Sequence, residues 1–164
     1  PLRDGSTVLL FHDFLLPVSS PENARRIGKL RKRDRLEGFP LLHLDFYRDD
    51  PSEIGWPEWI GAHGYRRSAL NRGIRFRRIA ACLEAVKSDA GLMICGLALL
   101  GDELEQGKLT LPFPVSTGAW SSHAFQASFR RDTLSRPQVR HFRDWLAAEA
   151  AETARQLRQR AGTG

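Results

Sequence analysis

Short apolar runs typical of β-strands alternate with helical segments along most of the chain. The strand-like runs are 7–11, 14–18, 39–46, 74–76, 92–95, 109–113 and 121–129. The segments that favour helices are 21–27, 56–63, 78–88, 97–106 and a longer one that begins near residue 137. Strands that alternate with helices of about ten residues predict an α/β sheet, with crossover helices on both of its faces.

Several helix ends carry residues that define the boundary. Ser20 can cap the first helix while Pro21 takes its first position, where the missing N–H costs nothing. Gly64 can end the second helix in a left-handed conformation. Ser135 is the predicted cap of the last helix. The apolar stripe of that helix consists of Val139, Phe142, Leu146 and Ala150. Its charged end, residues 155–164, is expected to fray.

The composition argues against several classes of protein. The 164 residues are 41% hydrophobic and 27% charged, and no apolar run approaches the length of a membrane span. Residues 1–5 are polar and the apolar run 8–11 is too short for a signal peptide, so the cytoplasm is the default compartment. Cys82 and Cys95 lie in apolar patterns typical of core residues, which indicates neither a disulfide nor a thiolate metal site.

The sequence contains no residue pattern typical of catalysis. A Gly-x-Ser-x-Gly nucleophile elbow and a phosphate-binding loop are both missing from it. The five histidines are scattered and form no His-x-x-x-His pair, which argues against a metal site. We therefore expect no catalytic residue, no metal and no cofactor, and we expect that the protein is not an enzyme.

Two arginines occupy an unusual position at the start of a helix. Arg77 and Arg78 stand where the helix 78–88 begins, and cations there oppose the helix dipole at a cost of roughly 0.3–1 kcal/mol each. A strand end that leads into a helix is also where open α/β sheets bind ligands. The two arginines and the helix amides would attract an anionic ligand. In the alternative interpretation, both side chains point to solvent or pair with Glu84 or Asp89.

Much of the net charge of +6 lies in two basic stretches. Their basic residues are Arg25, Arg26, Lys29, Arg31, Lys32, Arg33 and Arg35 in one, and Arg66, Arg67, Arg72, Arg75, Arg77 and Arg78 in the other. Neither stretch is interleaved with aromatic residues, and neither follows a zinc-finger or RNA-recognition pattern. A solvated surface is one interpretation, and direct nucleic-acid binding by residues 25–35 is the alternative.

A series of motifs follows in a characteristic order along the chain. They are Leu-Leu-Pro-Val-Ser-Ser-Pro at 15–21, Leu-Leu-His at 41–43, Trp-x-x-Trp at 56–59, Ala-x-Gly at 62–64, the segment 76–91, Leu-x-x-Gly-x-Leu at 104–109, Pro-Phe-Pro at 112–114 and Pro-x-Val-x-x-Phe-Arg-Asp-Trp-Leu at 137–146. This succession resembles the effector domain of LysR-type transcriptional regulators, especially the branch with activators of glycine cleavage and of β-lactamase genes. The resemblance extends from about Thr7 to Glu152.

The resemblance implies a type 2 periplasmic-binding-protein-like fold, in which crossing strands join two α/β lobes and a small-molecule cleft lies between them. The chain is then one complete lobe plus part of the second. Residues 15–95 correspond to the second lobe of the family, residues 108–152 return to the first, and residues 153–164 form a charged tail. The DNA-binding helix-turn-helix would precede this sequence, so DNA binding is expected only through that missing domain of the parent protein.

The resemblance also implies which residues bind the effector and how the protein assembles. The expected effector-binding residues are Phe76, Arg77, Arg78, Ala90, Phe125 and Gln126. Arg77 replaces a small polar residue and Phe125-Gln126 replaces a pair of tyrosines common in the branch, which indicates a different, acidic ligand. The helix 78–88 resembles one at the dimer interface of the family, so the parent is expected to be a homodimer or homotetramer. A periplasmic solute-binding protein of the same bilobal plan is the alternative.

Overall fold

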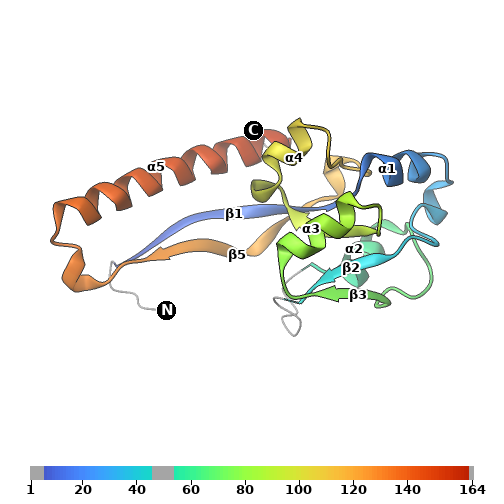
Figure 1. Cartoon of the computed structure of the whole chain (residues 1–164), viewed down its shortest axis with the longest axis horizontal. Helices are drawn as coiled ribbons and strands as arrows, with labels where there is room; N and C mark the ends of the chain where they lie inside the picture. The colour runs from blue at the N-terminus through green and yellow to red at the C-terminus, as the bar shows by residue number, and fades with distance from the viewer. Residues whose placement is uncertain (1–5, 46–53, 163–164) are drawn as a thin grey trace.

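The computed structural model describes residues 6–45 and 54–162, and these residues form one mixed sheet in the order β3-β2-β4-β1-β5 (Figure 1). Its strands are β1 (Thr7–Val18), β2 (Leu41–Leu44), β3 (Gly73–Phe76), β4 (Leu92–Gly96) and β5 (Ala119–Ser128). The α-helices are α1 (Pro21–Gly28), α2 (Trp56–His63), α3 (Ile79–Lys87), α4 (Gly101–Glu105) and α5 (Pro137–Arg160). The predicted α/β sheet is thus confirmed, while Phe46, the predicted end of one strand, lies outside the described residues.

The long strand β1 divides the molecule into two parts. Its carboxyl half pairs with β4 through residues 15–18, and its amino half pairs with β5. That amino half, β5 and the first half of α5 project from the rest of the structure (Figure 1). We call this projection the arm (residues 7–12 and 119–149) and the remainder the lobe. The apolar runs 7–11 and 14–18, predicted as separate strands, are therefore one strand with register shifts at residues 9–11 and 12–14.

Two hydrophobic cores cover the two faces of the lobe's sheet. Adjacent residues of one strand point to opposite faces, so Leu41 and Leu42 enter different cores. Helices α1 and α2 pack on one face, where the indole of Trp59 donates a hydrogen bond of 2.7 Å to the carbonyl of Thr117. Helix α3 and the end of α5 pack on the other face, where Leu157 is buried. This arrangement matches the crossovers expected from the alternation of strands and helices.

Two predicted helix ends are confirmed. The amide of Asn23 donates to the Ser20 hydroxyl at 3.2 Å, so Ser20 caps α1. Gly64 follows α2 with a φ of 69°, in the left-handed region that suits glycine. The predicted cap of the last helix is wrong. Ser135 donates to the carbonyl of Asp132 instead, and Arg136 occupies the cap position of α5 without a side-chain hydrogen bond.

Three other predictions near the carboxyl end need correction. The segment 97–106 is a 3-10 turn, η2 (Leu97–Leu99), followed by α4, because Leu97 and Leu100 are both buried and a spacing of three suits a 3-10 turn. The segment 109–113 is not a strand. Only Thr110 pairs with Ser19, since the prolines of the Pro-Phe-Pro motif remove backbone donors. Helix α5 also continues to Arg160 instead of fraying from residue 155.

Candidate functional site

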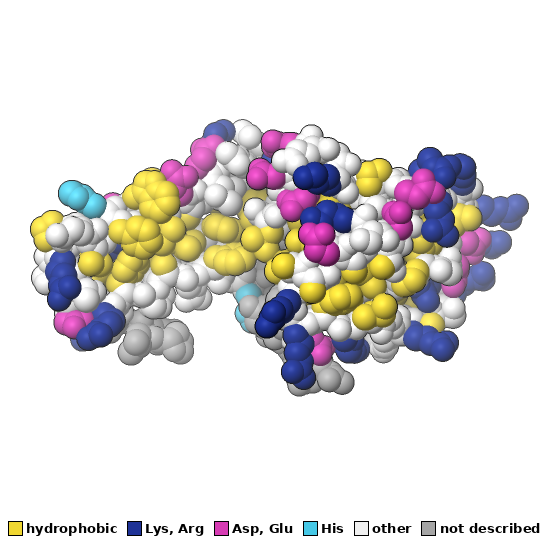
Figure 2. Space-filling model, viewed as in Figure 1, with side chains coloured by type: hydrophobic (Ala, Val, Ile, Leu, Met, Phe, Trp, Pro, Cys, Tyr) yellow, Lys and Arg dark blue, Asp and Glu magenta, His cyan; other side chains and the backbone are white. Residues whose placement is uncertain are grey.

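The carboxyl ends of three strands meet at the edge of the lobe that faces the arm. Strand β2 is parallel to both β3 and β4, so all three end at this edge. Helix α3 and η2 begin directly after β3 and β4. Figure 2 shows the molecule hollowed beneath the arm, on the side to which these strand ends point. Open α/β sheets bind their ligands outside such strand ends, and we take this hollow as the candidate site.

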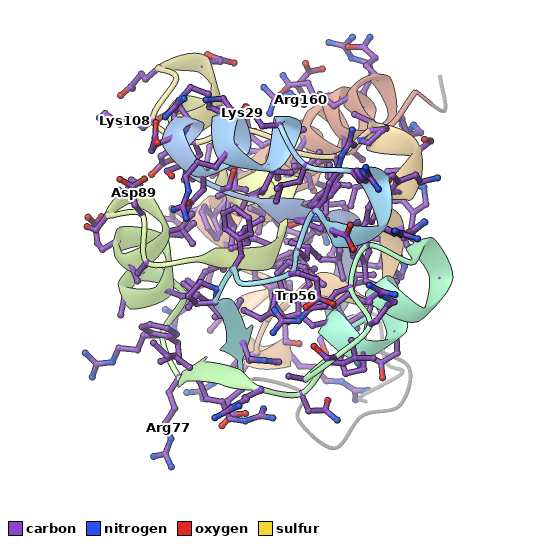
Figure 3. All side chains as sticks on the ribbon, turned by 90° about the vertical axis from the view of Figure 1, so that its right-hand side faces the viewer. Lys29, Trp56, Arg77, Asp89, Lys108 and Arg160 are labelled. Atoms are coloured by element: carbon purple, nitrogen blue, oxygen red, sulfur yellow. The ribbon has the colours of Figure 1, made fainter. Side chains whose placement is uncertain are left out.

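Two predicted site residues, Arg77 and Arg78, lie at this edge with exposed side chains. Arg78 is the cap residue of α3 but gives the helix amides no side-chain hydrogen bond. Arg77 points away from the body of the lobe (Figure 3). Neither arginine forms an ion pair within residues 6–45 and 54–162, because Glu84 pairs with Lys87 and the Asp89 carboxylate accepts a hydrogen bond from Ser20. The pairing with Glu84 or Asp89 is therefore not formed, and the exposed side chains agree with the other half of that alternative, in which both arginines point to solvent.

The strand ends next to these arginines hold a fixed ion pair. Asp45 follows β2, and its amide donates to the carbonyl of Phe76 at 2.9 Å. Its carboxylate accepts a hydrogen bond from Arg75 at 3.2 Å. Phe76, a predicted site residue, is half-buried and packs on the core beneath α3. The carboxylate of Asp45 at this edge is therefore already paired with Arg75. Arg77 and Arg78 have no carboxylate partner within the described residues.

A buried carboxylate marks the elbow where the arm meets the lobe. Asp13 lies in β1 at a register shift and is 4% exposed. Its carboxylate accepts hydrogen bonds from the amides of Phe14 at 2.8 Å and Ala98 at 3.0 Å, and so joins β1 to η2. Burial raises the pKa of the Asp13 carboxyl, although these backbone amides act in the opposite direction. Asp13 is not among the predicted site residues, and its one signal in the sequence is a charged residue between two apolar runs.

The remaining predicted site residues are separated by the fold. Phe125 and Gln126 lie on β5, in the arm, at the edge of the sheet opposite to β3. Phe125 is 44% exposed, and its ring centroid lies 4.9 Å from that of Phe11. Ala90 follows the carboxyl end of α3, whereas Arg78 precedes its amino end. The nine residues of α3 span about 14 Å, so Ala90 does not share the edge of Phe76 and Arg77.

The pKa values of Cys82, Cys95 and His43 are shifted toward the uncharged form of each side chain. Burial raises the pKa of both Cys82 and Cys95 to about 12, which keeps them as thiols. Burial and the charge of Arg75 lower the pKa of His43, which keeps its ring neutral. Among the described residues, no three His, Cys, Asp or Glu side chains are grouped so that they could hold a metal ion. In the same part of the chain, no helix combines the length and apolarity that crossing a membrane requires.

Comparisons with known proteins bear directly on this architecture. A family model for the LysR substrate binding domain matches residues 3–151. The chain is also similar to the HTH-type transcriptional regulator TrpI of Pseudomonas aeruginosa, with 29% identity over 136 residues. This alignment covers 82% of the chain and 43% of TrpI, so the chain spans less than half the length of that relative.

Solved structures agree with the family model. The effector domain of the transcriptional regulator AmpR of Pseudomonas aeruginosa superposes with a TM-score of 0.70 at 28% identity, over 92% of this chain and 68% of that one. The regulatory domain of CrgA from Neisseria meningitidis gives a TM-score of 0.66 at 19% identity, over 92% of this chain and 72% of that one, which shows the fold alone. The chain therefore belongs to the LysR substrate-binding domain family, the effector-binding domains of LysR-type transcriptional regulators.

Proposed function

We propose that this domain binds a small anionic metabolite in the hollow between the lobe and the arm. The binding then controls transcription through a DNA-binding domain of the parent regulator, in the cytoplasm. The observation that carries the proposal is the exposed pair Arg77 and Arg78 at the carboxyl edge of the sheet. The family model and the similarity to TrpI favour this function over that of a periplasmic solute-binding protein.

The electrostatics of the edge support an anion rather than a cation. The first amides of α3 have no side-chain cap, and the helix dipole places partial positive charge on them. Arg77 and Arg78 add two full charges at the same helix end, and neither is neutralised within the described residues. A carboxylate or phosphate group bound there would accept hydrogen bonds from guanidinium and backbone donors together. Such a ligand would remove the unfavourable interaction of the two arginines with the helix dipole.

We also propose a division into lobes that follows the bend of β1. Residues 15–95 form the second lobe of the family's effector domain, and residues 108–152 return to the first lobe, with Phe113 and Thr117 at the start of the return still packed against the second. The apolar side chains of the arm support this division, because Trp120, Phe125, Phe142 and Trp145 are between 38% and 56% exposed. The charged tail at 153–164 begins inside α5, and Leu157 ties it to the lobe. Phe125 and Gln126 then contribute to the site from the first-lobe side.

Ligand control further requires two arrangements of an oligomer with different affinities for the effector. We propose that the outward face of α3, which presents Ala80, Ala81 and Glu84 to solvent, contacts a second copy in a homodimer or homotetramer. Since Arg78 directly precedes the same helix, an effector at the carboxyl edge and a partner on α3 would act on one rigid element. This arrangement would couple the site to the assembly.

Calorimetric titration of the chain with citrate, succinate, glutamate and inorganic phosphate tests the anionic site. At least one of these probes is expected to bind, and Arg77→Gln or Arg78→Gln is expected to weaken that binding about tenfold or more, since a hydrogen bond to a charged group contributes about 1.5–3 kcal/mol. Arg136→Gln, which removes an exposed arginine on the arm side, is the matched control and should leave the affinity unchanged. An affinity unaffected at residues 77 and 78, or no binding of any probe, would refute the anionic site.

A further inference from the structure

The end of the lobe farthest from the arm carries a concentrated positive charge. We call residues 22–37 together with Arg66 and Arg67 the basic tip. It holds nine of the 25 Lys and Arg residues of the chain and three of the 19 Asp and Glu residues, which leaves 16 of each sign elsewhere. The whole net charge of +6 is therefore located in the tip. Figure 2 shows Lys and Arg side chains gathered at this end, and Figure 3 looks directly onto it.

The loop of the basic tip is held in one conformation by hydrogen bonds to its backbone. The Arg66 guanidinium donates to the carbonyls of Leu36 at 3.2 Å and Phe39 at 2.8 Å. The amide of Leu36 donates to the carbonyl of Tyr65, and the Glu37 carboxylate accepts from the amide of Arg67. The 3-10 turn η1 (Lys32–Asp34) therefore presents its cations from a fixed frame, and ordering them on a partner costs less entropy.

Several cations of the tip remain available to a partner. Lys29 and Arg31 are exposed and form no ion pair within the described residues. The Lys32 ammonium lies 5.8 Å from the ring centroid of Tyr65 and is exposed as well. Arg33 and Arg67 share the single carboxylate of Asp34, at 3.6 and 3.5 Å. The tip therefore has more exposed cations than carboxylates to neutralise them.

The chemistry of the surface distinguishes between possible polyanions. The aromatic rings of Phe39, Trp59 and Tyr65 are buried beneath the cations, so the described residues of the tip expose no ring that could stack on an unpaired base. Leu30, 39% exposed, is the one large apolar side chain that the tip exposes in the described structure, which gives a membrane little to insert. A rigid, convex array of Lys and Arg without stacking or apolar anchors suits the phosphate backbone of a duplex.

We propose that the basic tip contacts the phosphate backbone of duplex DNA without reading its sequence. The inference rests on the proposed function, because a regulator's effector domain is held near DNA by its parent protein. The contact would be separate from the effector site, since the tip lies at the far end of the lobe from the arm (Figure 1). It would add sequence-independent affinity to the parent's own DNA-binding domain and influence how the effector domain lies along the duplex.

Fluorescence anisotropy of this chain with a labelled 30-bp duplex of arbitrary sequence, in the absence of any effector, tests the proposal. About four phosphate contacts predict a slope near −3.6 for log K against log salt, because each contact contributes about −0.9. The variant Lys29→Gln/Arg31→Gln/Lys32→Gln is expected to reduce that slope by about 2–3. The variant Arg130→Gln/Arg136→Gln/Arg140→Gln loses the same charge from the arm and is expected to change the slope by less than about 1.

Three results would overturn the proposal. The first is that the wild-type chain does not bind the duplex at about 50 mM salt, or binds it with an affinity that does not change as salt is added. The second is an equal loss of binding in both variants, which would indicate attraction by net charge alone. The third is tip-dependent binding to vesicles that contain anionic phospholipid, without binding to the duplex. Circular dichroism of both variants checks that they fold, and none of these outcomes bears on anion binding at Arg77 and Arg78.

Discussion

Replacing Gly96 with alanine is expected to break the hydrogen bonds at the elbow between arm and lobe. A Cβ atom at this position would lie 1.9 Å from Oδ2 and 2.4 Å from Cγ of Asp13. Gly96 has a φ of −73°, which alanine adopts without strain, so the whole effect comes from this collision. The carboxylate would have to leave the amides of Phe14 and Ala98. With about 1.5–3 kcal/mol per hydrogen bond to a charged group, the loss of both bonds lowers the stability by about 3–6 kcal/mol.

Urea unfolding followed by tryptophan fluorescence measures this loss, and a double-mutant cycle identifies its cause. In an Asp13→Ala background the carboxylate is absent, so Gly96→Ala should cost less than about 1 kcal/mol there. Gly61→Ala serves as the control, because nothing lies within 4 Å of its Cβ position in α2 and helix propensity alone should stabilise by up to about 1 kcal/mol. An equal cost of Gly96→Ala in both backgrounds would refute the role of Asp13.

Two further predictions concern the same joint. Leu157→Ala should destabilise the chain by about 2–5 kcal/mol because Leu157 is 2% exposed within the core, and urea unfolding that shows less than about 1 kcal/mol would contradict the docking of α5. Burial raises the pKa of Asp13 in the folded chain above its ordinary 3.8. Between the pKa of the unfolded chain and that of the folded chain, folding takes up a proton, so the free energy of unfolding decreases as the pH rises through this window. Asp13→Ala should remove that decrease in unfolding experiments across the window, and an unchanged pH dependence would exclude Asp13 as its source.

Local patterns predicted the fold best where short-range chemistry determines the structure. The Ser20 cap depends on an amide three residues away, and the end of α2 depends on the left-handed conformation of Gly64. Predictions were wrong where distant contacts decide. The end of α5 stays helical because Leu157 enters a core formed by residues far away in the sequence. The error at Ser135 has a local cause instead, because its hydroxyl donates to the carbonyl of Asp132 in the preceding turn.

The candidate site shows the same division between local and long-range information. Arg77 and Arg78 could be predicted because local sequence patterns indicate both the end of the preceding strand and the start of the following helix. A residue between a strand and a helix lies at the edge of the sheet, so the same patterns predicted their position. Ala90 does not share that edge because α3 separates it from Arg78 by the length of the helix. Asp13 could not be found from sequence, since its role depends on Gly96 and Ala98, more than eighty residues away.

Helix α5 also has a mechanical consequence for the domain. With 24 residues it is about 36 Å long, and it is fastened at both ends: Phe142 contacts Phe129 near the outer end of the arm, and Leu157 lies in the core of the lobe. The helix therefore connects the arm to the lobe core alongside the joint at Asp13. A change in the angle of the arm would have to bend α5 or withdraw Leu157 from the lobe core, so the angle at Asp13 is coupled to the helix and its packing.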